Sequence, residues 1–367
     1  MNISGQLVLE DRIVGASMSF DALIGDIAPD ASAPDRYILP GFVDGHVHGG
    51  DGADTMDGVD AIHRMSRFHL SHGTTTILPT TITRPWADVM DALHAVAEVW
   101  RSGIPDGPQV HGAHLEGPFV SPHRLGAQPP FAIAPDPAHV DEALATGVVR
   151  VVTLAPELDH ARTAMETFAR AGVRVSLGHT VTDYEGAEQA ICRICAAGGV
   201  AGATHLFNAM APIESRRPGP VTALMCSDAA YAEMIFDTHH VHPATFRLAH
   251  RVMGSRLLFV TAAMRGTGGG AGISQLGGQT VHIKDGVARL DNGSLAGSVL
   301  TLDAALRNAV DAGKSLSEAA ALVSTNAARY LGLDDRGRLS TGCRADFVVM
   351  NSALQVEEVW VGGRRLR

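Results

Sequence analysis

The chain has 367 residues, of which 46% are hydrophobic and 19% are charged, and its formal net charge is −10. This composition can form a large core and excludes an intrinsically disordered protein, and the length fits one barrel with a small additional module. The acidic balance argues against nucleic acid as a partner, because it would repel a phosphodiester backbone, although a local cation could still bind a phosphorylated small molecule.

The N-terminal segment MNISGQLVLEDRIV lacks the basic region and apolar run of a secretion signal. No uncharged apolar stretch of about 18 residues occurs, so we expect no membrane span and no membrane partner. Together these features favour a cytoplasmic protein. Residues 1–40 and 338–367 contain short β-like runs separated by turn residues. We expect these two ends to pair into one small, discontinuous β-sandwich domain.

Between the two ends, residues 41–337 alternate short apolar runs with amphipathic helical patterns. The eight candidate strands are LPGFVDGHVH, TTTILPT, QVHGAHLEGPF, VRVVTLAP, VRVSLGHT, AGATHLF, AEMIFDTHHV and RLLFVTAAM. This alternation predicts an α/β fold, specifically a (β/α)8 TIM-like barrel. After the eighth strand, residues 272–294 indicate a β-hairpin insert.

Polar side chains gather where the predicted strands end, which is where barrel enzymes place their active sites. His46 and His48 end the first strand, Glu116 the third, His179 the fifth and His205 the sixth. Because alternate strand residues share a face, His46 and His48 point the same way. Imidazole and carboxylate ligands suit zinc and related metals, and a bridging glutamate could hold two ions. Any one histidine could be a packing residue, but the whole set favours a metal centre.

The motifs around these residues are more selective than the histidines themselves. GFVDGHVHG, HLEGPF, SLGHT and THLFNAM followed by RRPG resemble the N-acetylglucosamine-6-phosphate deacetylases of the amidohydrolase superfamily. The resemblance covers nearly the whole chain, through TNAARYLGL to RADFVV. It implies hydrolysis of N-acetyl-D-glucosamine 6-phosphate, an amino sugar phosphate, to D-glucosamine 6-phosphate and acetate by metal-activated hydroxide.

The resemblance also implies a set of metal ligands. Glu116, His179 and His205 match the central ligands, and His46 and His48 match those of the two-metal members. Some relatives lack the HxH pair and use one metal. We therefore expect one or two divalent ions, zinc first, with iron or another metal as the alternative.

Further positions match the family's substrate contacts. Arg216 matches the arginine that meets the sugar phosphate, often in the neighbouring subunit, which implies a homodimer; Arg217 is the alternative. In FDTHHV the expected contact is His240, with His239 as the alternative. The full predicted set is Ala127, Gln128 (a histidine in some relatives), Asn208, Ala209, Arg216, His240, Leu295, Ala296 and Gly297.

One position departs from the family pattern. The family has an aspartate after the threonine of the eighth strand, and this chain has Ala262 after Thr261. The resemblance implies that this aspartate activates the metal-bound water, ligates a metal and protonates the leaving amine. General acid–base assistance is worth roughly 10²–10⁴ in rate, or about 3–5 kcal/mol of barrier. We expect a severely impaired catalyst, and we interpret Ala262 as an engineered substitution, with natural loss of activity as the alternative.

Two other functions stay open. The first is another amidohydrolase reaction, such as that of a D-aminoacylase, dihydroorotase or deaminase, although HLFNAM and Arg216 argue against it. The second is a non-catalytic sugar-phosphate-binding scaffold, which only Ala262 motivates. The pair Cys192 and Cys195 lies in a helical segment, and we interpret both as packing residues. The segment GTGGGA at 266–271 lacks a following helix, so we expect a flexible active-site loop rather than a dinucleotide site.

Overall fold

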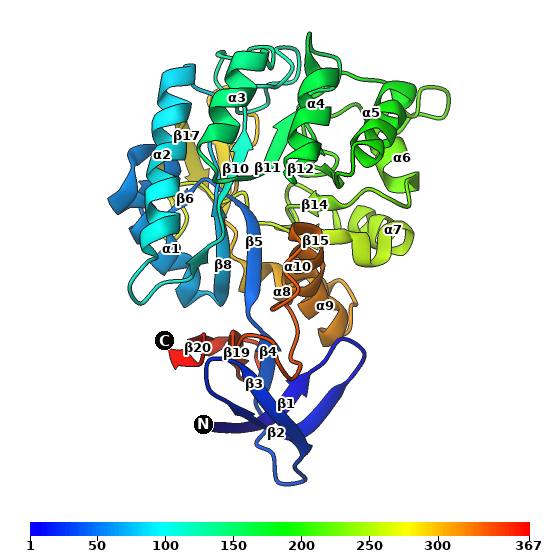
Figure 1. Cartoon of the computed structure of the whole chain (residues 1–367). Coiled ribbons are helices and arrows are strands. Elements are labelled where there is room, and N and C mark those ends of the chain that lie inside the picture. Colours follow the sequence, from blue (N-terminus) through cyan, green and yellow to red (C-terminus); the bar gives the residue numbers. More distant parts are fainter.

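The computed structural model describes residues 1–367 and contains the expected barrel. Figure 1 shows the barrel strands surrounded by helices, with both chain termini in a separate small domain at one end. The eight barrel strands are β5 (Phe42–Val47), β8 (Thr74–Pro79), β10 (Ala113–Glu116), β11 (Val149–Leu154), β12 (Arg174–Leu177), β13 (Ala201–Ala203), β14 (Ala232–Met234) and β15 (Leu257–Phe259). The short strand β9 (Gln109–Val110) precedes β10. The predicted (β/α)8 barrel is confirmed.

Backbone hydrogen bonds join the strands all the way round the barrel. Strands β10 to β13 form one parallel sheet, β5 and β8 are parallel neighbours, and β14 pairs with β15. The bridges Thr80–His114 and Val47–Ala263 join two further pairs of neighbours near their carboxyl ends. The segments of β13 and β14 are joined at both ends, by Tyr231 N–H to Ala201 O and by Leu206 N–H to Glu233 O. These junctions bring the polar strand ends together.

The helices cover the outside of the barrel. They are α1 (Val59–Ser71), α2 (Trp86–Ser102), α3 (Pro137–Ala145), α4 (Ala161–Arg170), α5 (Tyr184–Ala196), α6 (Gly219–Cys226), α7 (Pro243–Met253), α8 (Leu302–Asp311), α9 (Leu316–Val323) and α10 (Thr325–Leu331). Their apolar stripes and the strands share one core of 81 buried residues. In α1, for example, Ile62, Met65 and Leu70 follow the helical repeat and are buried. No helix combines the length and the apolar character needed to cross a bilayer.

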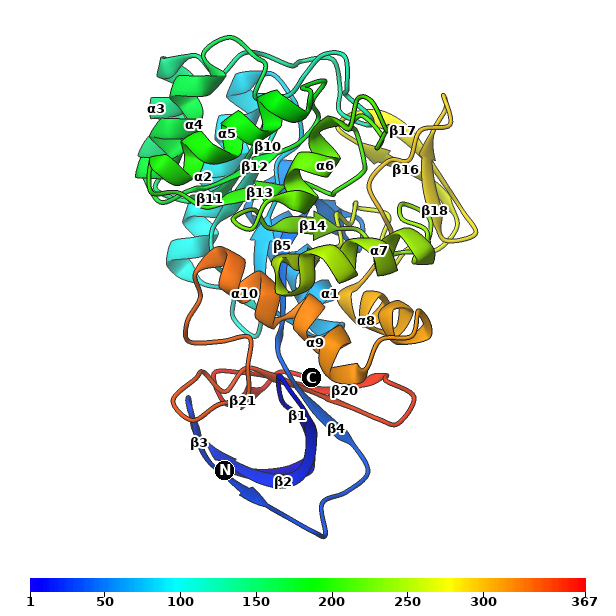
Figure 2. The ribbon, with the colours of Figure 1, turned by 90° about the vertical axis from the view of Figure 1, so that its right-hand side faces the viewer.

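The small domain is built from both ends of the chain. Its strands are β1 (Asn2–Val8), β2 (Ile13–Phe20), β3 (Ile24–Pro29), β4 (Tyr37–Pro40), β19 (Phe347–Met350), β20 (Val356–Val361) and β21 (Arg364–Arg365). They form one sheet in the order β21-β20-β19-β4-β1-β2-β3. The sheet curls around 12 buried residues (Figure 2), and Ile24 N–H donates to Cys343 O across the curl, at 2.8 Å. The expected sandwich therefore takes the form of one curled sheet.

An insert follows β15 and lies away from the small domain (Figure 2). It has three antiparallel strands rather than one hairpin: β16 (Gly272–Leu276), β17 (Gln279–Lys284) and β18 (Val287–Leu290). Leu276 and Ile283 of the insert pack with Ile82 and Met264 of the barrel. A second, smaller hairpin of β6 (Gly49–Gly50) and β7 (Ala53–Asp54) follows β5. The insert and this hairpin therefore each follow a barrel strand whose end carries a predicted site residue, Ala262 after β15 and His48 after β5.

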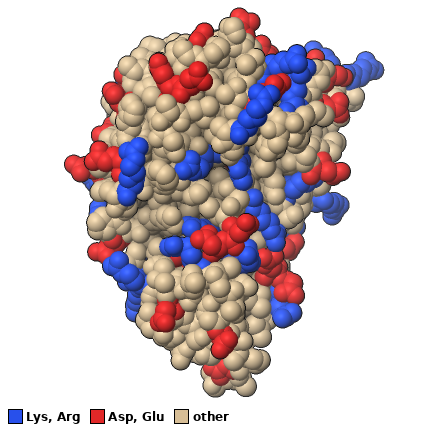
Figure 3. Space-filling model, in the orientation of Figure 1, with Lys and Arg blue, Asp and Glu red and all other residues tan.

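Two surface features complete the description. On the face shown in Figure 3, basic side chains are interspersed with acidic ones. All four cysteines are free, and Cys192 and Cys195 on α5 are exposed. The expectation that these two cysteines are packing residues is wrong, because α5 turns them to solvent and buries Ile191 and Ile194 instead.

Candidate active site and metal centre

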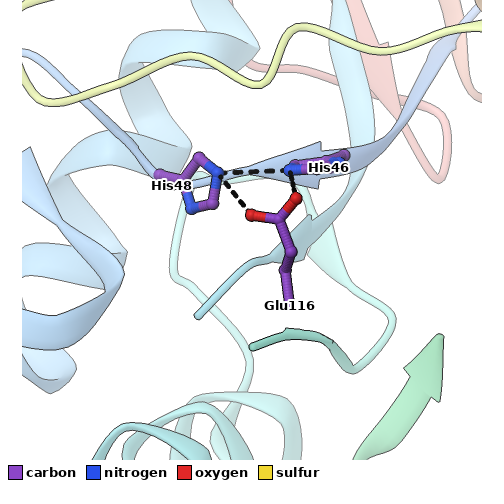
Figure 4. A group of neighbouring side chains, drawn as sticks. All are labelled: His46, His48 and Glu116. Atoms are coloured by element: carbon purple, nitrogen blue, oxygen red, sulfur yellow. Dashed lines mark hydrogen bonds and ion pairs between the residues drawn. The ribbon is translucent and has the colours of Figure 1, made fainter. Parts of the chain in front are cut away.

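The five predicted metal ligands, from four separate strands, meet at the Glu116 carboxylate. Glu116 Oε1 lies 3.0 Å from His205 Nε2, 3.4 Å from His179 Nε2 and 3.6 Å from His46 Nε2. Glu116 Oε2 lies 3.3 Å from His48 Nε2. Figure 4 shows His46 and His48 facing this carboxylate from the end of β5. The five residues form two groups, each compact enough for one ion, and the groups share Glu116.

Hydrogen bonds to the Nδ1 atoms of His179 and His46 determine which form of each ring nitrogen faces Glu116. His179 Nδ1 lies 2.8 Å from the Arg124 carbonyl oxygen, and His46 Nδ1 lies 3.0 Å from Glu233 Oε2. Both partners accept hydrogen bonds, so each neutral ring carries its proton on Nδ1 and directs the Nε2 lone pair toward the Glu116 carboxylate. Acceptors that face one another in a buried site need a cation between them. The residues therefore fit a divalent metal.

The pKa shifts at this site follow from burial and from the charges of the neighbouring side chains. Burial disfavours a charged His46 ring, but the Glu116 and Glu233 carboxylates outweigh it and raise the pKa of His46 to about 10. Burial likewise opposes the ionised form of Glu116, but the surrounding histidines, His46 first, hold the pKa of Glu116 well below its ordinary value. Burial lowers the pKa of His205 to about 4. A metal ion at His46 would take the place of a proton.

Three residues that follow barrel strands share an unusual backbone conformation. The φ angles of His179, His205 and Ala262 are 48°, 35° and 44°. Left-handed backbone costs a non-glycine residue about 1–3 kcal/mol, and it is enriched in asparagine, aspartate and histidine. Two of the three positions hold histidine, as this preference favours, and the third holds alanine. Ala262 thus has the same backbone conformation as two predicted metal ligands, but its methyl group makes no hydrogen bond that would offset the cost of that conformation.

A cavity of about 300 Å³ opens beside Glu116, His48, His179 and His205. Seven of the nine predicted substrate-binding residues line it: Ala127, Gln128, Asn208, Ala209, His240, Leu295 and Gly297. Ala296 is fully buried in the insert core instead, because its backbone N–H donates to Ala288 O at 3.0 Å. Ala262 is also buried and does not line the cavity.

The predicted phosphate ligand lies elsewhere. Arg216 is exposed and borders a second hollow with Arg124 and Arg217, rather than the cavity beside Glu116. Arg217 forms an ion pair with Glu214 at 2.9 Å, whereas no ion pair involves Arg216 within the chain. Within one subunit, therefore, the structure does not bring Arg216 together with the other predicted contacts.

Two polar side chains on the cavity wall are held in fixed orientations. Gln128 accepts a hydrogen bond from Thr83 N–H at 2.7 Å, so its amide nitrogen faces Glu116 Oε2, at 2.6 Å. His240 Nδ1 lies 2.7 Å from Asp237 Oδ2. Of the two adjacent histidines in FDTHHV, His240 lines the cavity and His239 is exposed. Hydrogen bonds within the protein therefore fix the orientations of the Gln128 amide and the His240 imidazole on the cavity wall.

Sequence reasoning missed part of the site. The cavity wall includes the apolar residues Ile82, Ile235 and Leu276, which no motif distinguished from core residues. Behind His46 lie Glu233 and His114, both buried. A glutamate inside the otherwise apolar run AEMIF was the signal that could have revealed Glu233, because an unpaired carboxylate is rarely buried.

Comparison of the sequence with known proteins identifies the family of this chain. The amidohydrolase family profile matches residues 37–366. The chain is 37% identical over 335 residues to the N-acetylglucosamine-6-phosphate deacetylase of Lysinibacillus sphaericus, covering 90% of this chain and 85% of that one. It is 36% identical over 363 residues to the N-acetylgalactosamine-6-phosphate deacetylase of Escherichia coli O157:H7, covering 97% and 95%.

Solved structures agree with the sequence comparison. The N-acetyl-D-glucosamine-6-phosphate deacetylase of Mycobacterium smegmatis matches with a TM-score of 0.92 and 33% identity over 100% of both chains. An aspartate-to-alanine variant of that deacetylase, in complex with N-acetyl-D-glucosamine-6-phosphate, matches with a TM-score of 0.92 and 34% identity over 100% of this chain and 99% of that one. On sequence, fold and the arrangement of its histidines and glutamate, this chain belongs to the amidohydrolase family.

Proposed function

We propose that this protein is a metal-dependent deacetylase of N-acetyl-D-glucosamine 6-phosphate, which it hydrolyses to D-glucosamine 6-phosphate and acetate. The observation that carries the proposal is the meeting of four imidazoles at the Glu116 carboxylate, beside a cavity of about 300 Å³ that His48, His179 and His205 line together with Glu116. The deacetylases among its relatives support the choice of reaction. Amino sugar phosphate is the ligand class that the relatives share.

The chain's own residues have distinct parts in this proposal. Glu116, His179 and His205 would hold one divalent ion, and His46 and His48 a second one that shares Glu116; we propose zinc, with iron as the alternative. A bound ion supplies an activated water and polarises the amide carbonyl. Gln128 and His240 would orient the substrate, since both are fixed by hydrogen bonds on the cavity wall.

Turnover is expected to be slow because of Ala262. The proton of the attacking water must reach the departing amine, and alanine can neither accept nor deliver it. A methyl group also supplies no ligand to a metal. We therefore propose a site that binds its substrate and hydrolyses it poorly.

Arg216 motivates a homodimer. It is exposed, does not line the cavity of its own subunit, and lies near Ile213, which is 49% exposed. We propose that the loop at 211–218 docks on a second copy and that Arg216 there meets the substrate phosphate, for which a guanidinium fork is suited. We also propose a cytoplasmic location, because a sugar phosphate does not cross a bilayer unaided.

The N-acetylgalactosamine-6-phosphate relative matches 97% of the chain, so the epimeric substrate is a second candidate. The test is acetate release from both N-acetylhexosamine 6-phosphates and from the unphosphorylated sugars, with zinc or iron supplied, for the parent and for Ala262→Asp. We expect the phosphorylated glucosamine derivative to be the best substrate. If the unphosphorylated sugars react equally well, the phosphate assignment is wrong. If the parent binds the sugar phosphate and Ala262→Asp still hydrolyses nothing, the protein is a binding scaffold.

A further inference from the structure

A buried carboxylate lies behind one of the candidate metal ligands. Glu233 in β14 is 1% exposed, and its Oε2 lies 3.0 Å from His46 Nδ1. Neither Glu233 nor His46 lines the cavity, so Glu233 has no route to the substrate. A buried carboxylate is costly unless it has a charge partner, and His46 is the only group hydrogen-bonded to this one.

Glu233 could itself belong to a third metal site, because Glu233, His46 and His114 lie within ligand distance of one another. The hydrogen bonds of His114 argue against it. Its Nδ1 lies 3.1 Å from Gly45 O and its Nε2 lies 2.8 Å from Thr153 Oγ1, so both ring nitrogens are engaged. The remaining oxygen, Glu233 Oε1, lies 3.8 Å from His114 Nδ1, beyond a hydrogen bond. The contact that remains for Glu233 is His46.

We propose that Glu233 is a positioning residue for His46, and that it decides whether the site made by His46, His48 and Glu116 keeps its ion. By accepting a hydrogen bond from Nδ1–H of His46, Glu233 fixes the ring orientation and leaves the Nε2 lone pair directed at Glu116. Such carboxylate partners of metal-binding histidines are typically worth about 10–100-fold in metal affinity. The inference rests on the metal centre proposed above.

The arrangement makes the effect specific to one ion. In the group of Glu116, His179 and His205, no carboxylate lies behind a histidine: His179 Nδ1 faces the Arg124 carbonyl, and His205 Nδ1 has no partner. Removal of Glu233 should therefore weaken the ion held by His46 and His48 and spare the ion held by His179 and His205.

The experiment measures zinc binding without substrate. Metal-free parent, Glu233→Gln and Glu233→Met are dialysed against buffered Zn²⁺ at graded free concentrations, and bound zinc per chain is measured by elemental analysis. Cobalt absorption spectra of the same proteins report the coordination of each ion. We expect two ions in the parent. Glu233→Met should lose about 10–100-fold in affinity for one ion only, and Glu233→Gln, whose amide oxygen can still accept from Nδ1, should lose less.

Asp303→Asn is the matched control, because Asp303 is also a buried carboxylate that pairs with a histidine, His72 Nδ1, at 3.2 Å. It lies on α8, outside the site, and this variant should bind both ions as the parent does. Thermal unfolding of the metal-free proteins checks folding, and Glu233→Gln carries the test if Glu233→Met unfolds. The inference is overturned if the parent binds one ion, if both Glu233 variants bind as the parent does, or if both ions weaken equally. Because no substrate is used, these outcomes are separate from the fate of the deacetylase proposal.

Discussion

The substitution Ala262→Asp should convert this chain into an efficient hydrolase. Ala262 N–H donates to His46 O at 2.8 Å and Ala262 O accepts from Ser298 N–H at 2.9 Å, so the strand end is held by its backbone, whatever the side chain. The φ angle of 44° is one that aspartate adopts more readily than alanine does. The new carboxylate should therefore enter without a backbone shift.

The expected gain follows from the proton that this carboxylate can carry. General acid–base assistance contributes roughly 10²–10⁴ in rate, equivalent to about 3–5 kcal/mol of barrier. The gain should appear in kcat, with KM for N-acetyl-D-glucosamine 6-phosphate changed little, in an assay of acetate release with zinc present. Ala262→Asn is the control, because asparagine also tolerates left-handed backbone but cannot transfer the proton. An equal gain in both variants, or no gain in Ala262→Asp, would refute the reasoning.

Three further results are expected. Removing metal with a chelator should lower the melting temperature, because an ion at 100 times its Kd contributes about 2.7 kcal/mol to the folded state, and calorimetry showing no shift would argue against a metal centre. In the Ala262→Asp background, Arg216→Ala should raise KM for the phosphorylated substrate about 10–100-fold, because it removes a charged contact worth about 1.5–3 kcal/mol. Arg217→Ala is the control and should change KM little, because the Arg217 guanidinium pairs with Glu214. A protein that sediments as a monomer would contradict the cross-subunit role of Arg216. Burial lowers the pKa of His69 to about 4, so the folded state resists a proton that the unfolded chain accepts below its ordinary pKa of 6.5. Stability should therefore fall by up to about 3 kcal/mol between pH 6.5 and 4, and urea unfolding of His69→Gln should show a smaller loss over that range.

The barrel and the clustering of its histidines around Glu116 were predictable because both follow from local patterns. Alternating strand and helix periodicity indicates a barrel, and a barrel places the carboxyl ends of its strands together, so His46, Glu116 and His205 had to approach one another. The HxH spacing predicted that His46 and His48 share a face, and their Nε2 atoms lie 3.2 Å apart.

What escaped prediction depends on contacts between distant segments. The curl of the small sheet arises where Ile24 meets Cys343, more than three hundred residues along the chain. Ile82, Ile235 and Leu276 resemble core residues in sequence, and only the fold shows that they line the cavity. The sequence predicted Ala296 as a substrate contact, but in the structure its side chain is buried in the core beneath the insert.

The roles of Arg216 and Glu233 show two further limits. The proposed role of Arg216 requires a second subunit, which one chain does not specify. Glu233 acts on His46 from a strand far along the sequence, at 3.0 Å, and no spacing rule links the two residues.

Anomalous X-ray diffraction at the zinc absorption edge, from crystals grown with zinc, tests the central claim most directly. The account predicts an anomalous peak among Glu116, His179 and His205, at about 2.0–2.2 Å from the carboxylate oxygen and the imidazole nitrogens. Crystals that contain zinc but show no peak at that point would contradict it.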